Sequence, residues 1–330
     1  MKKILIIMLL FLCINVKASI VVMDADSGRI LYGKNENERK LIASTTKIMT
    51  SLIVLENSNI KTNLTVGEEV LKVNGSMIYS KPGEQYTIED LLYGLMLRSG
   101  NDAAMTLSYN VFGYNRFIQE MNSKAMQLGM TNTTYENPHG LNDDSENYSS
   151  AKDLSILMRY AIKNDKFLEI TRTNKYKNWY NKNELLNNYK YLISGKTGYT
   201  KKSGQVYVSA ASKNNKTLII SSINENDKYN LHKNLYEEYF NKYKKHKVLN
   251  QYTFSFKEKN NDKVHYYIKK DFDMLLKDDE INDLKIKVDV QNESVNIYIK
   301  EELVHSQRLY KLEYEKKVNI IKQILSFFGL

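Results

Sequence analysis

The chain has 330 residues and a formal net charge of +10, and it is 42% hydrophobic and 26% charged. This balance is typical of a globular protein and excludes a largely disordered chain. A single cysteine, Cys13, excludes a fold held together by internal disulfides. The basic charge suits an anionic surface, such as a cell-wall polymer or acidic lipid, but a lysine-rich composition alone would explain it equally well.

The first 18 residues have the pattern of a cleaved export signal. Two lysines precede an apolar stretch over residues 4–16, and residues 16–18 form an acceptable cleavage site. The stretch is shorter than the ~20 apolar residues that a membrane-spanning helix needs, so an uncleaved anchor is the less favoured alternative. We therefore expect an exported protein whose mature chain has lost Cys13.

Residues 19–245 are expected to form one α/β domain. Apolar runs on both sides of "DADSG" predict a β-hairpin near its start, and two further runs, 204–212 and 216–224, predict strands near its end. Capping boxes, "TIED" and "SAKD", open two of the helices. Helices are predicted over 45–56, 91–99, 115–129, 154–162 and 227–243. Because strands lie at both ends, we expect the terminal strands to share one sheet.

Residues 246–312 are expected to form a small β-rich domain. "LKIKVDV" at 284–290 and "VNIYI" at 295–299 alternate strictly between apolar and polar residues, which is the pattern of half-buried strands. "YTFSF" at 252–256 and "VHYYI" at 264–268 are two further candidate strands.

The final segment, residues 313–330, is predicted to be an amphipathic helix. At 100° per residue its apolar side chains cover one half of the helical wheel, with Lys317 as the exception. A basic terminal helix with two phenylalanines is typical of an anchor in a membrane interface. We expect it to bind the outer face of the cytoplasmic membrane. The alternative is a helix that docks on its own domain.

Three short motifs follow one another along the predicted α/β domain. They are Ser44-x-x-Lys47, Ser99-Gly100-Asn101 and Lys196-Thr197-Gly198. Each motif is weak alone, because Ser-x-x-Lys also occurs at Ser58 and at Ser149. Ser44 and Lys47, however, lie on a strongly apolar predicted helix, where residues three apart share a face. The ordered set is the trio of penicillin-binding proteins and class A β-lactamases, and it predicts an acyl-transfer enzyme with a serine nucleophile.

The sequences around these motifs resemble the low-molecular-weight penicillin-binding proteins of the D-alanyl-D-alanine carboxypeptidase family, peptidase family S11. The stretches are "ASTTKIMTSLIVLE", "TIEDLLYGLMLRSGNDAA", "NPHGL" and "SGKTGYTKKSG". The resemblance covers about residues 20–245 and implies a serine β-lactamase/DD-peptidase-like α/β (α+β) fold, with an antiparallel sheet flanked by helices. A following β domain and a terminal anchor also resemble the family, less specifically. Ile42 stands where the family often has proline, and Asn147 replaces its usual histidine, which leaves the subclass and the substrate preference open.

Lys47 can act as a base toward Ser44 only if its amine is neutral. A solvated lysine has a pKa near ~10.4, but desolvation in a cleft and a second cation nearby both lower it. Lys196 can be that cation, so Lys47 would be able to take the proton of Ser44. None of the five histidines occupies a motif position. His139, in "NPHG", suits a turn better than a base.

The resemblance implies the reaction. Ser44 attacks the carbonyl carbon between the two terminal D-alanines of a peptidoglycan stem pentapeptide, and water later releases the acyl-enzyme. Ser99 relays a proton to the leaving amine, and Asn101 holds the substrate amide and Lys47. β-Lactams would act as covalent inhibitors that are trapped as a slow acyl-enzyme at Ser44.

The resemblance also implies how substrate is bound. Lys196 and Thr197 bind its terminal carboxylate, and Gly198 lets the peptide lie close to a strand edge. The backbone N–H groups of Ser44 and Tyr199 form the oxyanion hole.

Three other functions share the motifs or the fold. A β-lactamase is suggested by "ELLN" at 184–187, but this segment ends nine residues before Lys196, too close to form the loop that places a deacylating water. A D,D-endopeptidase shares every catalytic part and stays open. A catalytically silent cell-wall scaffold would have no need for Ser44 together with Lys47. No metal, phosphate-loop or dinucleotide motif occurs, so no metal or cofactor is predicted, and the export signal argues against nucleic-acid binding.

Overall fold

The computed structural model describes residues 17–143, 145–258 and 261–313. Internal contacts divide the chain into two compact units. Among the described residues, the first unit consists of 17–22, 32–210 and 219–233, and the second of 23–31, 211–218 and 234–313. Almost all of the predicted signal peptide and of the predicted terminal helix lies outside the described residues. The predicted domain boundaries at residues 245 and 312 stay predictions.

A five-stranded sheet with the order β2-β1-β11-β10-β9 underlies the site. Its strands are β1 (Ser19–Asp24), β2 (Ile30–Lys34), β9 (Leu192–Thr200), β10 (Gly204–Lys213) and β11 (Lys216–Ile223). β1 lies beside β11, which confirms that the two ends of the predicted α/β region share one sheet. Asn214 and Asn215 both have positive φ and make the tight turn between β10 and β11. β9 is an edge strand, so one side of its backbone has no neighbour within this sheet.

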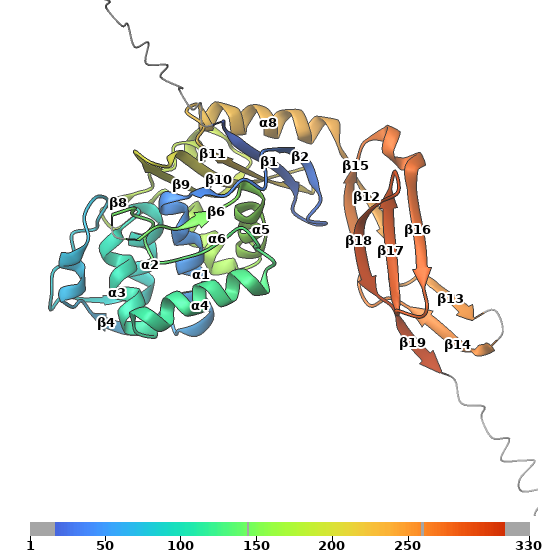
Figure 1. Cartoon of the computed structure of the whole chain (residues 1–330), viewed down its shortest axis with the longest axis horizontal. Helices are drawn as coiled ribbons and strands as arrows, with labels where there is room; N and C mark the ends of the chain where they lie inside the picture. Colours follow the sequence, from blue (N-terminus) through green and yellow to red (C-terminus); the bar gives the residue numbers. More distant parts are fainter. Residues whose placement is uncertain (1–16, 144, 259–260, 314–330) are drawn as a thin grey trace, which may run out of the picture. The chain divides into compact units, whose positions relative to one another are not determined.

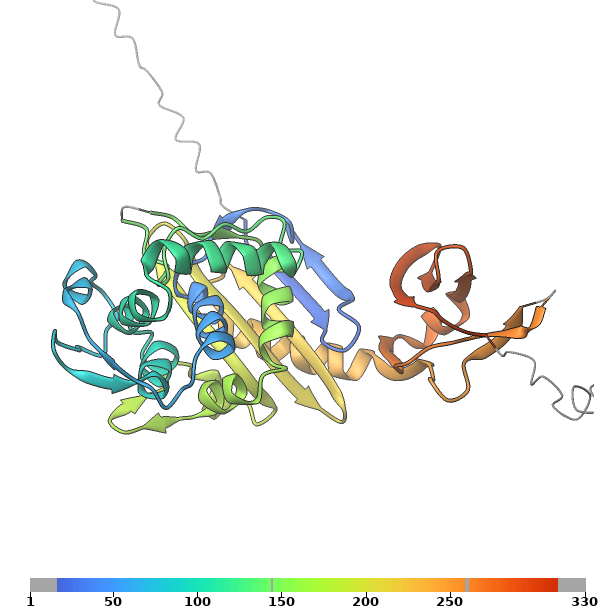
Figure 2. The ribbon, with the colours of Figure 1, turned by 90° about the horizontal axis from the view of Figure 1, so that it is seen from below.

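Two adjacent serines of β11 show which helices cover the two faces of the sheet, because successive side chains of a strand point to opposite faces. Ser221 lies 2.8 Å from Ser155 of α5 (Ala151–Ala161), measured between their Oγ atoms. Ser222 Oγ lies 2.9 Å from Nε2 of His232, which belongs to α8 (Lys228–Lys242). The start of α8 therefore covers one face, and the labelled helices between β2 and β9 lie on the other side (Figures 1 and 2).

The helical side is built around one buried helix. A 3₁₀ turn, η1 (Ala43–Thr46), continues into α1 (Lys47–Asn57), and every residue of α1 from Lys47 to Val54 is buried. The helices α2 (Ile88–Leu97), α3 (Asn101–Val111), α4 (Tyr114–Gln127), α5 and α6 (Asp165–Arg172) all contact α1. No helix in the described part of the chain is long and apolar enough to cross a membrane.

One half of each predicted capping box forms, namely the hydrogen bond from a helix N–H to the side chain of the cap residue. The Thr87 side chain accepts a hydrogen bond from the Asp90 N–H at the start of α2 (3.0 Å), and Ser150 accepts one from the Asp153 N–H at the start of α5 (3.1 Å). α4 ends just before Gly129, whose φ of +74° suits glycine. These side chains fix where the helices begin and end.

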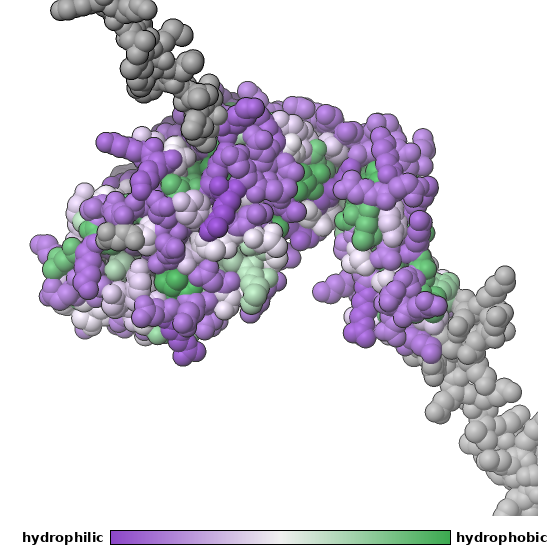
Figure 3. Space-filling model, in the orientation of Figure 1, coloured by the Kyte–Doolittle hydropathy of each residue, from purple (hydrophilic) through white to green (hydrophobic). Residues whose placement is uncertain are grey.

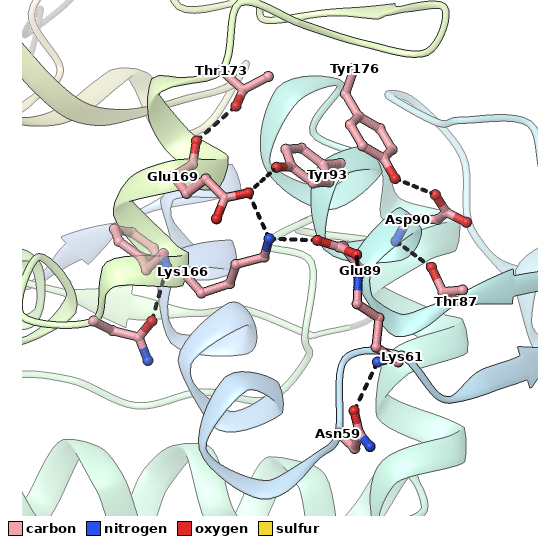
Figure 4. Close-up of polar contacts among 12 residues, drawn as sticks. Asn59, Lys61, Thr87, Glu89, Asp90, Tyr93, Lys166, Glu169, Thr173 and Tyr176 are labelled. Atoms are coloured by element: carbon pink, nitrogen blue, oxygen red, sulfur yellow. Dashed lines mark hydrogen bonds and ion pairs between the residues drawn. The ribbon is translucent and has the colours of Figure 1, made fainter.

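A polar cluster joins α2 and α6 to a small hairpin (Figure 4). Lys166 of α6 forms an ion pair with Glu89 of α2 (2.5 Å). The ring of Tyr176 stacks on Tyr93 with 3.7 Å between centroids, and its hydroxyl donates a hydrogen bond to Asp90 (2.7 Å). These contacts fix the hairpin, which consists of β7 (Lys175–Tyr176) and β8 (Trp179–Tyr180) and leads directly into one wall of the cleft described below.

The other short elements of this region are β3 (Lys40–Leu41) paired with β6 (Tyr148–Ser149), β4 (Asn63–Thr65) paired with β5 (Gln85–Thr87), η2 (Glu68–Lys72) and α7 (Leu185–Asn188).

The second unit contains the predicted β-rich region. Its elements are β12 (Lys244–Leu249) paired with β15 (Phe272–Leu276), the sheet of β13 (Ser255–Glu258), β14 (Asn261–Tyr267) and β19 (Tyr310–Glu313), η3 (Asp278–Asp283), and the sheet of β16 (Leu284–Asp289), β17 (Ser294–Ile299) and β18 (Glu302–Arg308). β17 alternates between buried and half-buried residues, as its sequence predicts. Its buried residues Val295, Ile297 and Ile299 belong to the core of this unit.

The prediction that 284–290 forms a half-buried strand is wrong in one respect. β16 forms, but Ile286 is 42% and Val288 is 39% exposed. Their cross-strand partners, Ile297 and Val295, are fully buried. β16 is the edge of a three-stranded sheet, so its apolar side chains pack against β17 on one side only. Hydrophobic patches are visible on this unit in Figure 3.

An ion pair within the second unit joins the turn after β1 to η3. The Arg29 guanidinium donates to both carboxylate oxygens of Glu280, at 2.5 and 3.0 Å, and to the Leu275 carbonyl oxygen at 3.1 Å. The side chains of Arg29 and Glu280 are only 15% and 8% exposed. Both charges have lost most of their contact with water, and each compensates the other for the lost solvation.

Replacing Glu280 with alanine is expected to lower the free energy of unfolding by about 3 kcal/mol, the low end for a buried pair, because Arg29 would be left largely buried without its counter-ion. Urea denaturation of the full chain measures this change. Glu301→Ala is the matched control, since its pair with Lys285 is exposed, and it should leave the midpoint unchanged. Equal effects of the two substitutions would contradict a structural role for the Arg29–Glu280 pair.

Candidate active site

Ser44 and Lys47 face each other where η1 passes into α1. Lys47 is fully buried, and its Nζ lies 3.0 Å from Ser44 Oγ. Two more oxygens surround the amine, Asn101 Oδ1 at 2.7 Å and the backbone oxygen of His139 at 2.6 Å. The structure thus brings together three residues singled out from the motifs and adds a carbonyl group that the motifs did not indicate.

The surroundings of Lys47 favour a neutral amine. Burial above all, and then the charge of Lys196, hold the pKa of Lys47 well below its usual value, against an opposing effect of Asp102. A neutral amine has two N–H groups and one lone pair. The two N–H groups can serve the oxygens of Asn101 and His139, which leaves the lone pair for the Ser44 hydroxyl. This is the arrangement that a general base requires.

The backbone beside Ser44 is held in a strained conformation. Ala43 has a φ of +45°, which is unfavourable for a residue with a Cβ atom. The Thr46 hydroxyl donates to the Ala43 carbonyl oxygen (2.8 Å). Gly140 of the "NPHG" turn has a φ of +90° and lies so close that an added Cβ would be 2.0 Å from the same oxygen. The turn that supplies the His139 oxygen to Lys47 therefore also packs directly against the backbone of the residue before Ser44.

Asn147 joins this turn to η1. Its Nδ2 donates to Thr46 Oγ1 and to the Asn137 carbonyl oxygen, both at 2.9 Å. Its Oδ1 accepts from the backbone N–H groups of Glu136 (2.7 Å) and Asn137 (3.1 Å). Asn137 Oδ1 in turn accepts from the Gly140 N–H (2.6 Å). One buried amide thus connects both segments that surround the Ser44–Lys47 pair.

Ser99 and Lys196 form a second pair. Lys196 Nζ donates to Ser99 Oγ (3.0 Å) and to the Thr197 carbonyl oxygen (2.8 Å). Burial, together with the charge of Lys182, lowers the pKa of Lys196 to about 7. Ser99 has a φ of +62°, a strained conformation for serine. Within the described part of the chain no hydrogen bond joins Ser99 to Ser44, so the two pairs meet only across the cleft.

One cleft of about 590 Å³ lies along the edge strand β9. Five of the eight residues predicted for the site line it, and the other three are buried and bonded to their neighbours. The lining residues are Ser44, Ser99, Thr197, Gly198 and Tyr199, and the buried ones are Lys47, Asn101 and Lys196. A Cβ on Gly198 would lie 2.9 Å from the backbone nitrogen of Ser44, so this close approach of strand and nucleophile requires glycine.

Comparison with known proteins identifies the family. A sequence model of the D-alanyl-D-alanine carboxypeptidases, Peptidase_S11, matches residues 14–227. The chain belongs to the D-alanyl-D-alanine carboxypeptidase family. The D-alanyl-D-alanine carboxypeptidase DacF of Bacillus subtilis is 35% identical over 212 residues, 60% of this chain and 54% of DacF. DacB2 of Mycobacterium tuberculosis is 34% identical over 210 residues, 61% of this chain and 72% of DacB2. The chain spans about half the length of DacF.

Solved structures of carboxypeptidases and penicillin-binding proteins have the same fold. A D-alanyl-D-alanine carboxypeptidase from Mycobacterium tuberculosis is 31% identical, with a TM-score of 0.64 over 68% of this chain and 90% of its own. Penicillin binding protein 6B from Escherichia coli is 25% identical, with a TM-score of 0.70 over 90% of this chain and 94% of its own. These likenesses confirm the fold class that the family resemblance implies. The predicted terminal helix lies outside the described residues.

Two groups at this site could not be identified from the sequence. The His139 group near Lys47 is a backbone oxygen, which no side-chain pattern reveals. Lys182 belongs to no motif, yet it lines the cleft, and its Nζ donates to Ser76 Oγ at 3.0 Å. Its charge contributes to the lowered pKa values of Lys47 and Lys196. Glu184, the first residue of "ELLN", also lines the cleft. Within the described residues no group of histidines, cysteines and carboxylates could hold a metal ion.

Asn147→Ala is expected to slow acylation of Ser44 by a β-lactam about tenfold or more, because small displacements of reacting groups cost large factors in rate. Rapid-mixing kinetics separates the initial binding of the drug from acylation, and only acylation should change. Asn147→His, the usual residue of the family, should restore part of the rate.

Asn122→Ala is the control for this prediction. Asn122 also bridges backbone groups, since its amide binds the Ile118 and Tyr135 carbonyl oxygens and the Tyr135 N–H, but it lies in α4. It should lower stability without slowing acylation. An acylation rate that stays at the wild-type value in Asn147→Ala would refute the positioning role.

Proposed function

We propose that the protein is a serine-type D-Ala-D-Ala carboxypeptidase that removes the terminal D-alanine from peptidoglycan stem pentapeptides. The observation that carries the proposal is the buried amine of Lys47, 3.0 Å from Ser44 Oγ and surrounded so that its lone pair is available to the hydroxyl. A serine with a base at this distance is an activated nucleophile. The family membership supplies the reaction class.

In the proposed reaction Lys47 takes the hydroxyl proton as Ser44 attacks the carbonyl carbon of the penultimate D-alanine. The backbone N–H groups of Ser44 and Tyr199 stabilise the oxyanion, and each such donor is typically worth about 10²–10³ in rate. Ser99 passes a proton to the leaving amine, and Asn101 holds the substrate amide. Water then releases the acyl group from Ser44.

The terminal carboxylate of the substrate is proposed to bind Lys196 and Thr197. The charge of Lys182, which also lines the cleft, adds to the attraction for this anion. Gly198 allows the peptide to approach β9 and to add to the edge of the sheet. The unpaired edge of β9 and the absence of a side chain at Gly198 support this mode of binding.

The protein is further proposed to act outside the cytoplasm. Residues 1–18 would direct export, 19–245 would form the catalytic domain, 246–312 a small β domain, and 313–330 an anchor on the outer face of the cytoplasmic membrane. The sequence pattern of the two termini and the cell-wall substrate of the proposed reaction support this arrangement.

Benzylpenicillin is expected to form a stable covalent adduct with Ser44. Intact mass measured over minutes to hours, followed by peptide mapping, detects it. Ser44→Ala should abolish the adduct, whereas Ser58→Ala, in the second Ser-x-x-Lys sequence, should retain it. Lys47→Met should slow its formation by about 10²–10⁴, the usual contribution of a general base.

Each other outcome of this experiment excludes the proposal. An adduct that clears within seconds while the drug is consumed would indicate a β-lactamase. The absence of any adduct would favour a catalytically silent scaffold.

The pH dependence of kcat/KM for a D-Ala-D-Ala peptide is expected to fall on the alkaline side above about pH 7. The pKa of Lys196 is lowered to about 7, so Lys196 loses the charge that binds the substrate carboxylate as the pH rises through this value. Lys182→Met removes a neighbouring like charge, which raises the pKa of Lys196, so the fall should move to higher pH. An alkaline limb that stays in place in this variant would contradict the assignment to Lys196.

A further inference from the structure

Residues 182–184 place two opposite charges on one wall of the cleft. The side chain of Asn183 is buried, and its Oδ1 accepts a hydrogen bond from the Tyr207 hydroxyl (2.9 Å). Lys182 and Glu184, on either side of it, both line the cleft. The buried amide thus fixes the segment so that its cationic and anionic neighbours face the same space.

The two charged side chains differ in the contacts that they make within the protein. Lys182 Nζ donates to Ser76 Oγ, and Ser76 lines the same cleft as Ser99. The Glu184 carboxylate, in contrast, forms no hydrogen bond or ion pair with any side chain of the described residues. The nearby amine of Lys228 donates instead to Gln205 Oε1 (2.7 Å), although the charge of Glu184 acts on it at longer range.

The wall of the cleft around residues 182–184 is more polar than a leaving D-alanine requires, because the side chain of alanine is one methyl group. Beyond Lys182 it consists of polar and charged groups, namely Glu184, Gln205, Lys228 and Tyr229. An apolar or narrow pocket would suit a methyl group, but a wall with an unpaired carboxylate suits a longer cationic side chain.

Resting on the proposed function, we infer that Glu184 forms a subsite for the side chain of the leaving residue and that this subsite favours a cationic side chain over an uncharged side chain of the same shape. The α-carboxylate of that residue would lie near Lys196, Thr197 and Lys182. Its side-chain ammonium would reach Glu184, two positions along the chain from Lys182.

The reaction itself is unchanged by this choice of leaving residue. The bond between the D-alanyl carbonyl carbon and the leaving nitrogen breaks as the Ser44 ester forms. The leaving amine gains the proton that Ser44 loses, and one water molecule then hydrolyses the ester. The products are the shortened peptide and a free D-amino acid with its second amine intact.

Acyl-peptides ending in D-Ala-D-X test the inference with the full-length protein. X is D-alanine, D-lysine, or D-2-aminoheptanoate, which has the shape of lysine without its charge. Chromatography of the released amino acid gives kcat/KM for each. Glu184 is exposed, so we expect D-lysine to be favoured over D-2-aminoheptanoate by about twofold to fivefold, the usual strength of an exposed ion pair.

Substitutions assign this preference to one carboxylate. Glu184→Gln should bring the ratio of D-lysine to D-2-aminoheptanoate close to one, and Glu184→Lys should reverse the preference toward D-glutamate over D-glutamine. Glu120→Gln, which changes a carboxylate of α4 paired with Arg116, is the matched control and should keep the wild-type ratio.

The results separate the inference from the function on which it rests. If D-alanine is released but D-lysine shows no advantage over D-2-aminoheptanoate, or if that advantage persists in Glu184→Gln, the subsite is refuted and the carboxypeptidase proposal stands. If no peptide of the series is hydrolysed and Ser44 takes no β-lactam, both are refuted together.

Discussion

The site depends on one physical constraint, which is that the amine of Lys47 must be kept out of water. A lysine amine in water is protonated at neutral pH and has no lone pair to offer. Here α1 is buried along the turn that carries Lys47, and burial is the largest influence on its pKa. The hydrophobic helices that pack around α1 are thus part of the proposed chemistry as well as of the core. A buried amine without acceptors would be costly, and Asn101 and His139 supply them.

Keeping this amine in place requires three segments that are distant in sequence to meet at close range. The 3₁₀ turn with Ser44, the turn with Gly140 and the strand with Gly198 approach so closely that a Cβ atom at either glycine would collide with Ala43 or Ser44. The positive φ values of Ala43 and Ser99 are part of the same arrangement. Such strain persists only where the surrounding contacts hold the backbone in place. The five hydrogen bonds of the Asn147 amide to Thr46, Glu136 and Asn137 are among these contacts.

The sequence is informative about this site where function is carried by side chains in fixed local patterns. Ser44 and Lys47 share a helical face whatever the rest of the chain does, and the Thr87 and Ser150 caps are local as well. The His139 oxygen and Lys182 could not be found in this way, because the first is a backbone atom and the second reaches the cleft only through tertiary packing. β16 shows the same limit, since an alternating pattern predicts a strand but not whether another element will cover its apolar side.

The two lysines of the site are coupled, and substrate binding changes the coupling. Without substrate the charge of Lys196 helps to keep Lys47 neutral. If the substrate carboxylate pairs with Lys196 as proposed, its negative charge offsets that of Lys196 as felt by Lys47, so the pKa of Lys47 rises in the complex. While the amine is neutral, a base with a higher pKa accepts a proton more readily, and the Ser44 proton is the one within reach. The same carboxylate that positions the peptide would thereby strengthen the base at the moment when it is needed. An uncharged substrate end would lose this effect in addition to the ion pair.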